Sequence, residues 1–424
     1  MKRYKAYKDS GVKWIGEIPS HWEVKKLRHL IKFVSIKGYG DKCLLSVTRE
    51  QGVIMRNTES KEENHNFIPE DLNGYKLVEK GQFVINKMKS WQGSYGVSIY
   101  DGIVSPAYYV CDLNYSCKEF FSMAIRSKAY IPFFAQFSKG IRVDQWDLSP
   151  IGLKTIPFMV PPLHEQQAIV DYLKDKTLKI EQYVSARERE RELFDSLKQS
   201  EIASVVNKGL NRNVKMKDSG IPWIGEIPEH WEVRTLSQMS REHFISNKNA
   251  HHQNLLSLSY GKIVNKDINT TEGLLPASFD SYQIVEDGNI VLRLTDLQND
   301  HKSLRVGLST QEGIITSAYL ALETFNDIIP LYLYYLLHTI DVKKVFYSMG
   351  NGLRQSLNWA ELRKLKCVVP PLSEQQAIVA YIDSKLQKID QYMSDLQREI
   401  DYLKEFKQRL ISDAVTGQLC VTKQ

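Results

Sequence analysis

The sequence is poor in features that metal binding, export or covalent chemistry would require. Its 424 residues include five cysteines, and no two form a CxxC pair, so we expect reduced thiols without a metal ligand set. The longest apolar run, 328–337, holds a proline and is about half as long as a membrane-spanning helix. The first residues, MKRYKAYKDSG, lack the apolar stretch of a signal peptide. We therefore expect a cytoplasmic protein with no membrane partner.

Catalytic motifs are also lacking. The sequence contains no GxxxxGK[ST] phosphate loop, so ATP hydrolysis by this chain is not expected. Glu405 and Lys407 imitate the ExK of a nuclease, but they lie in a region of helical periodicity where both side chains would be solvated. The sequence therefore predicts no catalytic residue.

Two blocks of sequence occur twice at one spacing. KDSGVKWIGEIPSHWEVKKL at 8–27 returns at 217–236 with fifteen of twenty positions identical, an offset of 209 residues. PPLHEQQAIVDYLKDKTLKIEQY at 161–183 returns at 370–392 with fifteen of twenty-three identical, at the same offset. The segments between the blocks match only in fragments. A duplicated frame around two dissimilar segments indicates one task carried out twice on two targets.

The second block opens a long helix in each copy. From Ser373 onward, apolar residues recur at steps of mostly three and four for about four heptads, which is typical of a coiled-coil seam. Pro370-Pro371 excludes helix before this point, and Ser373 with Gln376 predicts a capping box. The first copy carries a similar stripe, interrupted by the charged ARERERE at 186–192. We expect the two helices to pair antiparallel; the alternative is two separate helices, each lying on its own domain.

The intervening segments have mixed character. Short β-rich runs occur at 82–86, 96–100, 103–110, 289–294 and 313–322, and helical stretches occur at 118–127 and 330–347. The predicted fold class is therefore α+β, with two globular domains, two long antiparallel coiled-coil helices and a pseudo-twofold internal repeat. The expected boundaries are 1–160 and 211–369 for the globular domains, and 161–210 and 370–424 for the helices.

Polar loops in the two globular domains have the side chains that DNA reading needs. Basic, amide and aromatic residues alternate after the predicted strand that ends at Asn86, and a differently ordered set follows Leu292. Lys and Arg suit phosphates and guanine, and Gln and Asn suit adenine. The net charge of +6 permits a nucleic-acid partner. A solvated surface loop is the alternative for each residue. The candidate DNA-binding residues are Lys87, Lys89, Trp91, Gln92, Ser94, Tyr95, Arg142, Gln145, Arg293, Gln298, Asn299, His301, Lys302, Arg305, Arg354 and Gln355.

The repeated WIGEIPxHW block has two interpretations. His21 and His230 recur beside repeated tryptophans and glutamates, which would suit a paired active site. Aromatic packing around a Gly-Glu-Ile-Pro turn explains the same residues with fewer assumptions, and we favour it.

With its twin WIGEIPxHW blocks and twin PPLxEQQAIVxY helix openings, the chain resembles the DNA-specificity subunit of type I restriction–modification systems, from about residue 8 to 417. The resemblance implies a non-catalytic subunit whose two globular domains, as target-recognition domains, each read one half of an asymmetric, bipartite site in double-stranded DNA. It implies that the paired helices set the spacer between the halves. The charged 186–192 stretch departs from a fully apolar seam.

The same resemblance implies partners. These are two methyltransferase subunits that use S-adenosylmethionine and, where restriction occurs, two ATP-driven translocase–nuclease subunits that need Mg; this chain itself would hold no cofactor. The repeated blocks are the candidate docking surfaces, because matched surfaces can seat two copies of one protein. The candidate docking residues are Trp14, Glu17, Trp22, Trp223, Glu226 and Trp231. The alternatives are an enzyme and a coiled-coil interaction scaffold without DNA readout.

Overall fold

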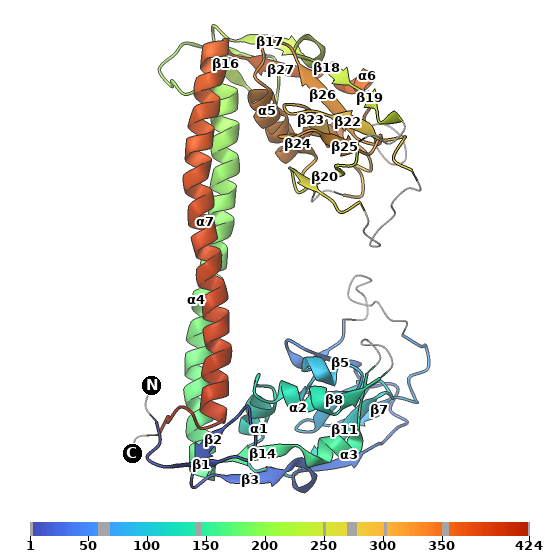
Figure 1. Cartoon of the computed structure of the whole chain (residues 1–424), viewed down its shortest axis with the longest axis vertical. Helices are drawn as coiled ribbons and strands as arrows, with labels where there is room; N and C mark the ends of the chain where they lie inside the picture. The colour runs from blue at the N-terminus through green and yellow to red at the C-terminus, as the bar shows by residue number, and fades with distance from the viewer. Residues whose placement is uncertain are drawn as a thin grey trace. The chain divides into compact units, whose positions relative to one another are not determined.

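The computed structural model describes residues 3–57, 68–140, 146–248, 252–268, 278–300, 303–349 and 356–422. It divides into two compact units (Figure 1), unit 1 with residues 1–188 and 398–424 and unit 2 with residues 189–397. The boundary between the units crosses both long helices, so each unit contains a globular part and a segment of each helix.

Unit 1 is built on a four-stranded antiparallel sheet in the order β4-β11-β8-β9. Its strands are β4 (Ile31–Val34), β11 (Tyr108–Leu113), β8 (Phe83–Asn86) and β9 (Tyr95–Val97). Two-stranded pairs surround it: β1 (Tyr7–Asp9) with β2 (Glu17–Pro19), β3 (Glu23–Lys26) with β14 (Pro157–Val160), β5 (Leu45–Thr48) with β6 (Gly52–Met55), β7 (Lys76–Val78) with β10 (Gly102–Val104), and β12 (Ser138–Lys139) with β13 (Asp147–Leu148). The short helices are α1 (Lys118–Ile125), α2 (Ile131–Gln136) and α3 (Pro150–Thr155), with 3-10 turns η1 (Leu27–His29) and η2 (Ser90–Gln92).

Unit 2 repeats this plan with a sheet in the order β18-β26-β23-β24. Its strands are β18 (Ser240–His243), β26 (Leu320–Thr324), β23 (Ile290–Leu292) and β24 (Val306–Leu308). The smaller sheets are β15 (Met216–Asp218) with β16 (Glu226–Pro228), β17 (Glu232–Thr235) with β27 (Lys366–Val369), β20 (Leu256–Ser259) with β21 (Lys262–Asn265), and β19 (Ile245–Ser246) with β22 (Gln283–Val285) and β25 (Gly313–Ile315). The short helices are α5 (Pro330–Val342), η4 (Leu236–Gln238), η6 (Val345–Ser348) and α6 (Trp359–Leu362).

The matched sheet orders confirm the α+β class and the internal repeat. An isolated parallel bridge even recurs, Leu44 with Ile103 in unit 1 and Leu255 with Ile314 in unit 2. Two of the expected strands are wrong in detail. The run 103–110 divides into β10 and β11, and 313–322 divides into β25 and β26, because a turn lies in the middle of each run.

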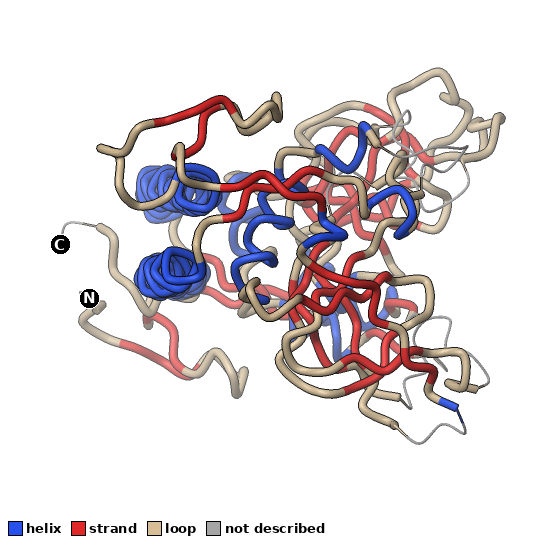
Figure 2. Tube along the Cα trace, turned by 90° about the horizontal axis from the view of Figure 1, so that it is seen from above, coloured by secondary structure: helices blue, strands red, loops and turns tan. Residues whose placement is uncertain are grey.

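The long helices are α4 (Leu163–Lys208) and α7 (Leu372–Val415), which lie side by side when viewed along their length (Figure 2). In unit 1, Lys407 pairs with Glu181 at 2.5 Å and Glu399 accepts a hydrogen bond from Tyr183. The residue numbers therefore rise along α4 while those of the partners on α7 fall, so the helices are antiparallel, as predicted.

Unit 2 shows the same direction of pairing. Lys198 bonds to Asp390 at 2.6 Å, and the Tyr381 hydroxyl bonds to Glu201 at 2.6 Å. The charged interruption at 186–192 finds polar partners across the seam. In unit 1, Arg187 forms an ion pair with Glu399 at 3.3 Å, which keeps a charged side chain compatible with the paired helices.

The predicted capping box at Ser373 is wrong. α7 already begins at Leu372, so Ser373 is its second residue rather than its cap. The carbonyl of Pro371 accepts the first backbone bonds, from the N–H groups of Glu374 and Gln375. Among the helices of the described residues, none is both long and apolar enough to cross a membrane.

Candidate nucleic-acid interface

In unit 1 the loop predicted to contact DNA, residues 87–94, joins β8 to β9. Its middle is the 3-10 turn η2, which Gly93 ends at φ 100°, a left-handed conformation that suits glycine. Trp91 is half-buried against Trp146, with ring centroids 5.3 Å apart. Lys89 is exposed, whereas Lys87 is held by Asp147 at 2.8 Å, and this bond raises the pKa of Lys87. The loop therefore presents one exposed lysine, and its Trp91 packs against Trp146.

Two candidates in this loop are wrong. Tyr95 is the first residue of β9 and is fully buried, stacked on Phe134 with ring centroids 3.8 Å apart. Ser94 is 3% exposed, because its backbone bridges Asn86 and Lys89 at the neck of the loop. Both residues stabilise the base of the loop and cannot touch DNA in this conformation. Gln92 stays half-buried at the rim.

In unit 2 the corresponding segment between β23 and β24 is residues 293–305, longer than its counterpart in unit 1. Arg305 is fully buried at its end, so its assignment to DNA is wrong. Its guanidinium donates to the carbonyls of Arg293, Thr295, Asp296 and Asp300 at 2.5–3.2 Å.

The Arg305 network also reaches the helices above the sheet. Its Nε donates to the Tyr347 hydroxyl at 3.1 Å, and its backbone N–H donates to Asp341 at 2.6 Å. Desolvation raises the pKa of the buried Asp341 carboxyl. Arg305 therefore gives the loop its shape rather than reading bases.

The remaining candidates in unit 2 lie on the outside of this loop or beyond the described residues. Gln298 and Asn299 are exposed, and the Asn299 amide donates to Asp296 at 2.7 Å. The Arg293 side chain is 36% exposed, 3.9 Å from the Asp300 carboxylate. The candidates that lie outside the described residues are Arg142, Gln145, His301, Lys302, Arg354 and Gln355.

Sequence reasoning missed a second element beside each loop, a β-hairpin turn. In unit 1 the turn 49–51 joins β5 to β6, and Arg126 clamps it by donating to the carbonyls of Arg49 and Glu50 at 3.2 and 2.8 Å. Arg49, Glu50 and Gln92 line one groove of about 610 Å³, so hairpin and loop share a surface. The alternating LSVT before the turn and Gly52 after it were the available signal.

The counterpart in unit 2 is the turn Tyr260-Gly261 between β20 and β21. Gly261 lies close to Leu304, next to Arg305 at the end of the 293–305 loop. Each unit therefore carries two adjacent connections that differ from those of the other unit in length and residue type.

The repeated blocks contact each other within each unit. In unit 1 the Trp22 indole N–H donates to Glu165 at 3.0 Å, and His21 Nε2 lies 2.6 Å from the same carboxylate. Unit 2 has the same arrangement, with Trp231 and His230 at 3.0 and 2.5 Å from Glu374. The interpretation as aromatic packing is thus the better one, and the blocks join each globular part to its helix.

This burial corrects the docking candidates. Trp22 and Trp231 are fully buried and cannot meet a partner. Trp14 is 47% exposed, with its ring against Phe133. Trp223 is half-buried beneath Lys343, and the carboxyl-bearing residues Glu17 and Glu226 are exposed.

The comparisons with known proteins bear on the same segments. The family model described as "Type I restriction modification DNA specificity domain" matches residues 228–401. Residues 228–401 are thus similar to that family. By the 209-residue offset the equivalent segment of the first copy is 19–192. The resemblance to type I DNA-specificity subunits is confirmed.

Two curated relatives from Methanocaldococcus jannaschii align over nearly the whole chain. The putative type I restriction enzyme MjaX specificity subunit is 22% identical and covers 96% of each chain. The type I restriction enzyme MjaVIII specificity subunit is 22% identical over 95% of this chain and 94% of its own. A solved chain from work on complex assembly and conformational transition of the type I R-M system has a TM-score of 0.67 at 15% identity, over 95% of this chain and 99% of that one. This likeness shows a shared fold.

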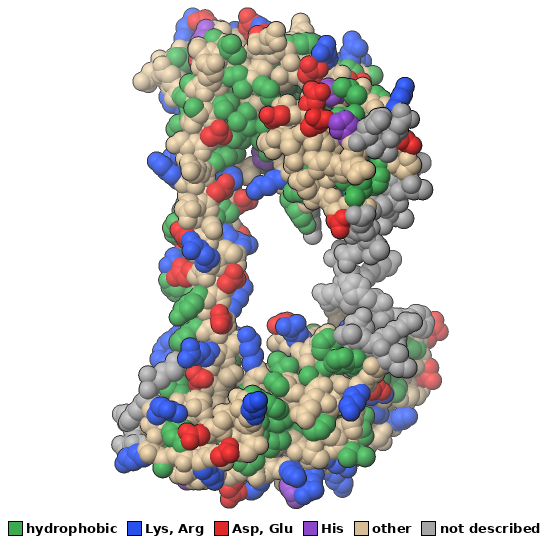
Figure 3. All heavy atoms as spheres, in the orientation of Figure 1, with side chains coloured by type: hydrophobic (Ala, Val, Ile, Leu, Met, Phe, Trp, Pro, Cys, Tyr) green, Lys and Arg blue, Asp and Glu red, His purple; other side chains and the backbone are tan. Residues whose placement is uncertain are grey.

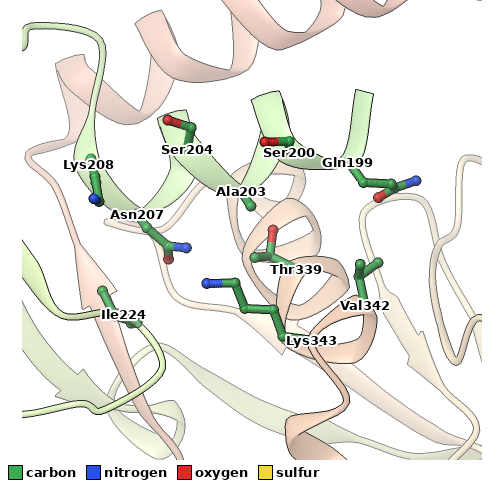
Figure 4. Close-up of a pocket in the computed structure, with 10 residues that line it drawn as sticks. All are labelled: Gln199, Ser200, Ala203, Ser204, Asn207, Lys208, Ile224, Thr339, Val342 and Lys343. Atoms are coloured by element: carbon green, nitrogen blue, oxygen red, sulfur yellow. The ribbon is translucent and has the colours of Figure 1, made fainter. Parts of the chain in front are cut away.

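A pocket of about 410 Å³ that none of the candidate DNA-binding residues lines lies between α4 and α5 of unit 2 (Figure 4). Thr339 and Val342 of α5, and Lys343 directly after it, extend toward Ala203 and Asn207 of α4. The rest of the lining consists of Gln199, Ser200, Ser204, Lys208 and Ile224. None of its ten lining residues is a carboxylate, histidine or cysteine. In the part of the chain that the structure describes, no three such residues form a group that could hold a metal ion.

Proposed function

We propose that the chain is the DNA-recognition subunit of a type I restriction–modification complex. In this proposal unit 1 and unit 2 each read one half of a bipartite, asymmetric DNA site. The observation that carries this proposal is that both units have the same sheet order but different connecting loops. Two units with the same scaffold and different exposed loops suit two different target sequences. A structural duplication alone would not require the loops to diverge in length.

The chemistry of readout is positioning plus hydrogen bonding. In unit 1, Lys89 neutralises a phosphate and Gln92 contacts a base edge, while Trp91 and Trp146 hold the loop in shape. In unit 2, Gln298 and Asn299 are the base-edge candidates, with amides suited to adenine. Each good base contact contributes roughly 1–3 kcal/mol of discrimination, and each neutralised phosphate contributes about one unit of salt dependence. The undescribed candidates Arg142, Gln145, His301, Lys302, Arg354 and Gln355 remain part of this proposal.

In this proposal, catalysis is carried out by the partner subunits. S-adenosylmethionine would be bound by the methyltransferase subunits, and ATP and Mg by translocase–nuclease subunits. The chain contributes recognition and spacing, with α4 and α7 setting the number of unread base pairs. Salt bridges and tyrosine hydrogen bonds between the two helices, such as Lys198 with Asp390, support a defined register.

Two methyltransferase subunits would dock on repeated, exposed residues. Val24 and Val233, 209 positions apart, are 41% and 37% exposed on β3 and β17. Leu163 and Leu372, at the same spacing, open α4 and α7 and are 59% and 44% exposed. Apolar side chains left in solvent at equivalent places of both units are a suitable pair of anchors for two copies of one protein.

The proposal is tested by co-expressing the chain with its modification subunit and exchanging residues 87–94 for an unrelated loop. Methylated adenines are mapped before and after the exchange. We expect one half-site to change and the other to stay. Simultaneous change of both half-sites would refute two separate readers.

A further inference from the structure

The hairpin turn of unit 2 places a bulky residue where the backbone disfavours one. Tyr260 has φ 48° and Gly261 has φ 76°, and the two form the whole connection between paired Ser259 and Lys262. A two-residue turn with positive φ at both positions favours Asn-Gly or Gly-Gly. A tyrosine in this conformation is an outlier. Its presence needs a reason that the turn itself does not supply.

The fold around the turn does not supply that reason either. The side chain of Tyr260 is 82% exposed, the largest value among the exposed large hydrophobic residues of the described chain. Within the described residues, neither its ring nor its hydroxyl has a hydrogen bond or ring contact, unlike Tyr334 and Tyr335. Strained residues of this kind persist at ligand-binding positions, where the strain presents a side chain.

The backbone beneath Tyr260 is held firmly. The carbonyl of Gly261 accepts a hydrogen bond from the Tyr334 hydroxyl of α5 at 3.4 Å. Leu258 and Ile263, on the two hairpin strands, pack closely over Gly307 of β24. Gly261 itself lies against Leu304, so a Cβ there would be 3.1 Å from the Leu304 side chain. The exposed ring therefore stands on a rigid tip beside the end of the 293–305 loop.

The equivalent turn of unit 1 indicates which kind of ligand Tyr260 contacts. The equivalent turn there is Arg49-Glu50-Gln51, one residue longer and without an aromatic. A surface that docks two copies of one partner should be repeated in both units, and Tyr260 is not repeated. A surface that reads a target sequence should differ between the units. Lys262, which follows the turn, is exposed, and so are Gln298 and Asn299 on the 293–305 loop whose end lies against Gly261; these polar side chains suit DNA.

We propose that Tyr260 is a specificity-determining residue that packs its ring against bases of the second half-site. This inference rests on the proposed function and assigns one residue within it. Because the backbone of the turn is already held by Tyr334 and Leu304, binding has to order only the side-chain torsions of Tyr260. The left-handed turn leaves the ring in solvent, where it is free to meet a duplex.

The test compares Tyr260→Gly, Tyr260→Asn and Tyr260→Phe in the complex of the chain with its modification subunits. The probe is a 40-base-pair duplex carrying the site that the wild-type methylation map identifies. Glycine and asparagine tolerate positive φ, so these variants should melt at the wild-type temperature or above. Their Kd for the duplex should rise about fivefold to a hundredfold, while Tyr260→Phe stays within about twofold. Tyr402→Ala, which removes a tyrosine 69% exposed on α7, is the control and should leave Kd unchanged.

The methylation map separates this inference from the function on which it rests. Tyr260→Gly should relax the second half-site and leave the first intact. A wild-type complex that prefers no DNA sequence overturns the proposed function and the inference together. A selective wild-type complex that Tyr260→Gly leaves unchanged overturns the inference alone. Equal losses for Tyr260→Phe and Tyr260→Gly also overturn it, because the phenyl ring should suffice.

Discussion

Trp22 donates its indole N–H to Glu165 at 3.0 Å across 143 residues of sequence, and Trp231 makes the same 3.0 Å bond to Glu374 at the same separation. The two repeated blocks are therefore two sides of one contact, made once in each unit. This contact fastens the start of each long helix to the globular part that precedes it. It explains why the blocks recur together at one offset.

Loss of this carboxylate should destabilise the two units unequally. The Glu165 side chain is 8% exposed and that of Glu374 is 39% exposed. Glu165→Ala should lower the free energy of unfolding by about 2–3 kcal/mol, because the Trp22 N–H and the Tyr4 hydroxyl, which donates at 3.0 Å, both lose a buried acceptor. Glu374→Ala should cost about 1 kcal/mol, because water can reach the place of the more exposed carboxylate. Urea denaturation measures both. Ser373→Ala, beside Glu374 and exposed, is the control with a change within about 0.5 kcal/mol. Equal costs for the two glutamates would contradict the account.

Removing the buried fork of Arg305 should damage unit 2 and its half-site. Arg305→Met leaves the carbonyls of the 293–300 segment without their donor, at a cost of about 2–4 kcal/mol. The matched control is Arg241→Met, which removes an exposed bidentate pair with Glu323 and should cost less than about 1 kcal/mol. Thermal unfolding gives the stabilities, and methylation mapping should show loss of the second half-site only. If Arg305→Met kept its stability but changed the recognised sequence, Arg305 would be a base contact after all.

The exposed Lys89 should control salt dependence in unit 1. Lys89→Ala should reduce the slope of log affinity against log salt concentration by about one unit without changing the recognised sequence. Lys25→Ala on β3, whose partner is Glu23 at 2.9 Å, is the control and should leave the slope unchanged. Fluorescence anisotropy of the complex with a labelled duplex at several salt concentrations measures this slope. A sequence change without a slope change would make Lys89 a base contact.

A buried histidine should make unit 2 sensitive to acid. His338 is 6% exposed and bonds to Gln199 at 2.8 Å, and desolvation lowers its pKa to about 4 from 6.5. The nearby Lys198 lowers the pKa further and Asp195 opposes it. Because the unfolded chain binds the proton first, stability is fully present above pH 6.5 and falls as the pH drops toward 4.

The matching variant is His338→Gln. It should unfold with a shallower pH dependence between pH 6.5 and 4 than wild type, by on the order of 2–3 kcal/mol across this window. Exposed His29→Gln is the control and should leave the profile unchanged. Identical profiles for wild type and His338→Gln would show that this imidazole does not govern acid sensitivity.

The length of the paired helices should determine the unread gap. Adding about one helical turn at matched positions of α4 and α7 should change the number of base pairs between the half-sites and leave both half-sites intact. Methylation mapping reports all three quantities together. An unchanged gap would refute the role of the helices as a ruler.

The architecture was predictable because its signals are local and repeated. Pro161-Pro162 and Pro370-Pro371 mark the starts of the long helices, and the apolar stripe predicts that they pair. The position of each cap was not predictable to one residue, since Pro371 rather than Ser373 closes the first turn of α7.

Candidate sites were harder, because a loop sequence does not state which side chains turn inward. Tyr95 and Arg305 have the composition of DNA contacts, yet one stacks in the core and the other bonds to four carbonyls of its own loop. Tyr260 shows the converse case. The residues next to it in the sequence do not reveal that its ring is exposed; this becomes clear only from the backbone conformation of the turn.

Single-molecule mapping of methylated adenines in cells that express this chain with its modification subunit would show whether the two units read DNA separately. Two separate readers predict one motif made of two different short half-sites at a fixed gap. Methylation at a single uninterrupted motif, or at two half-sites whose spacing varies freely, would contradict the account.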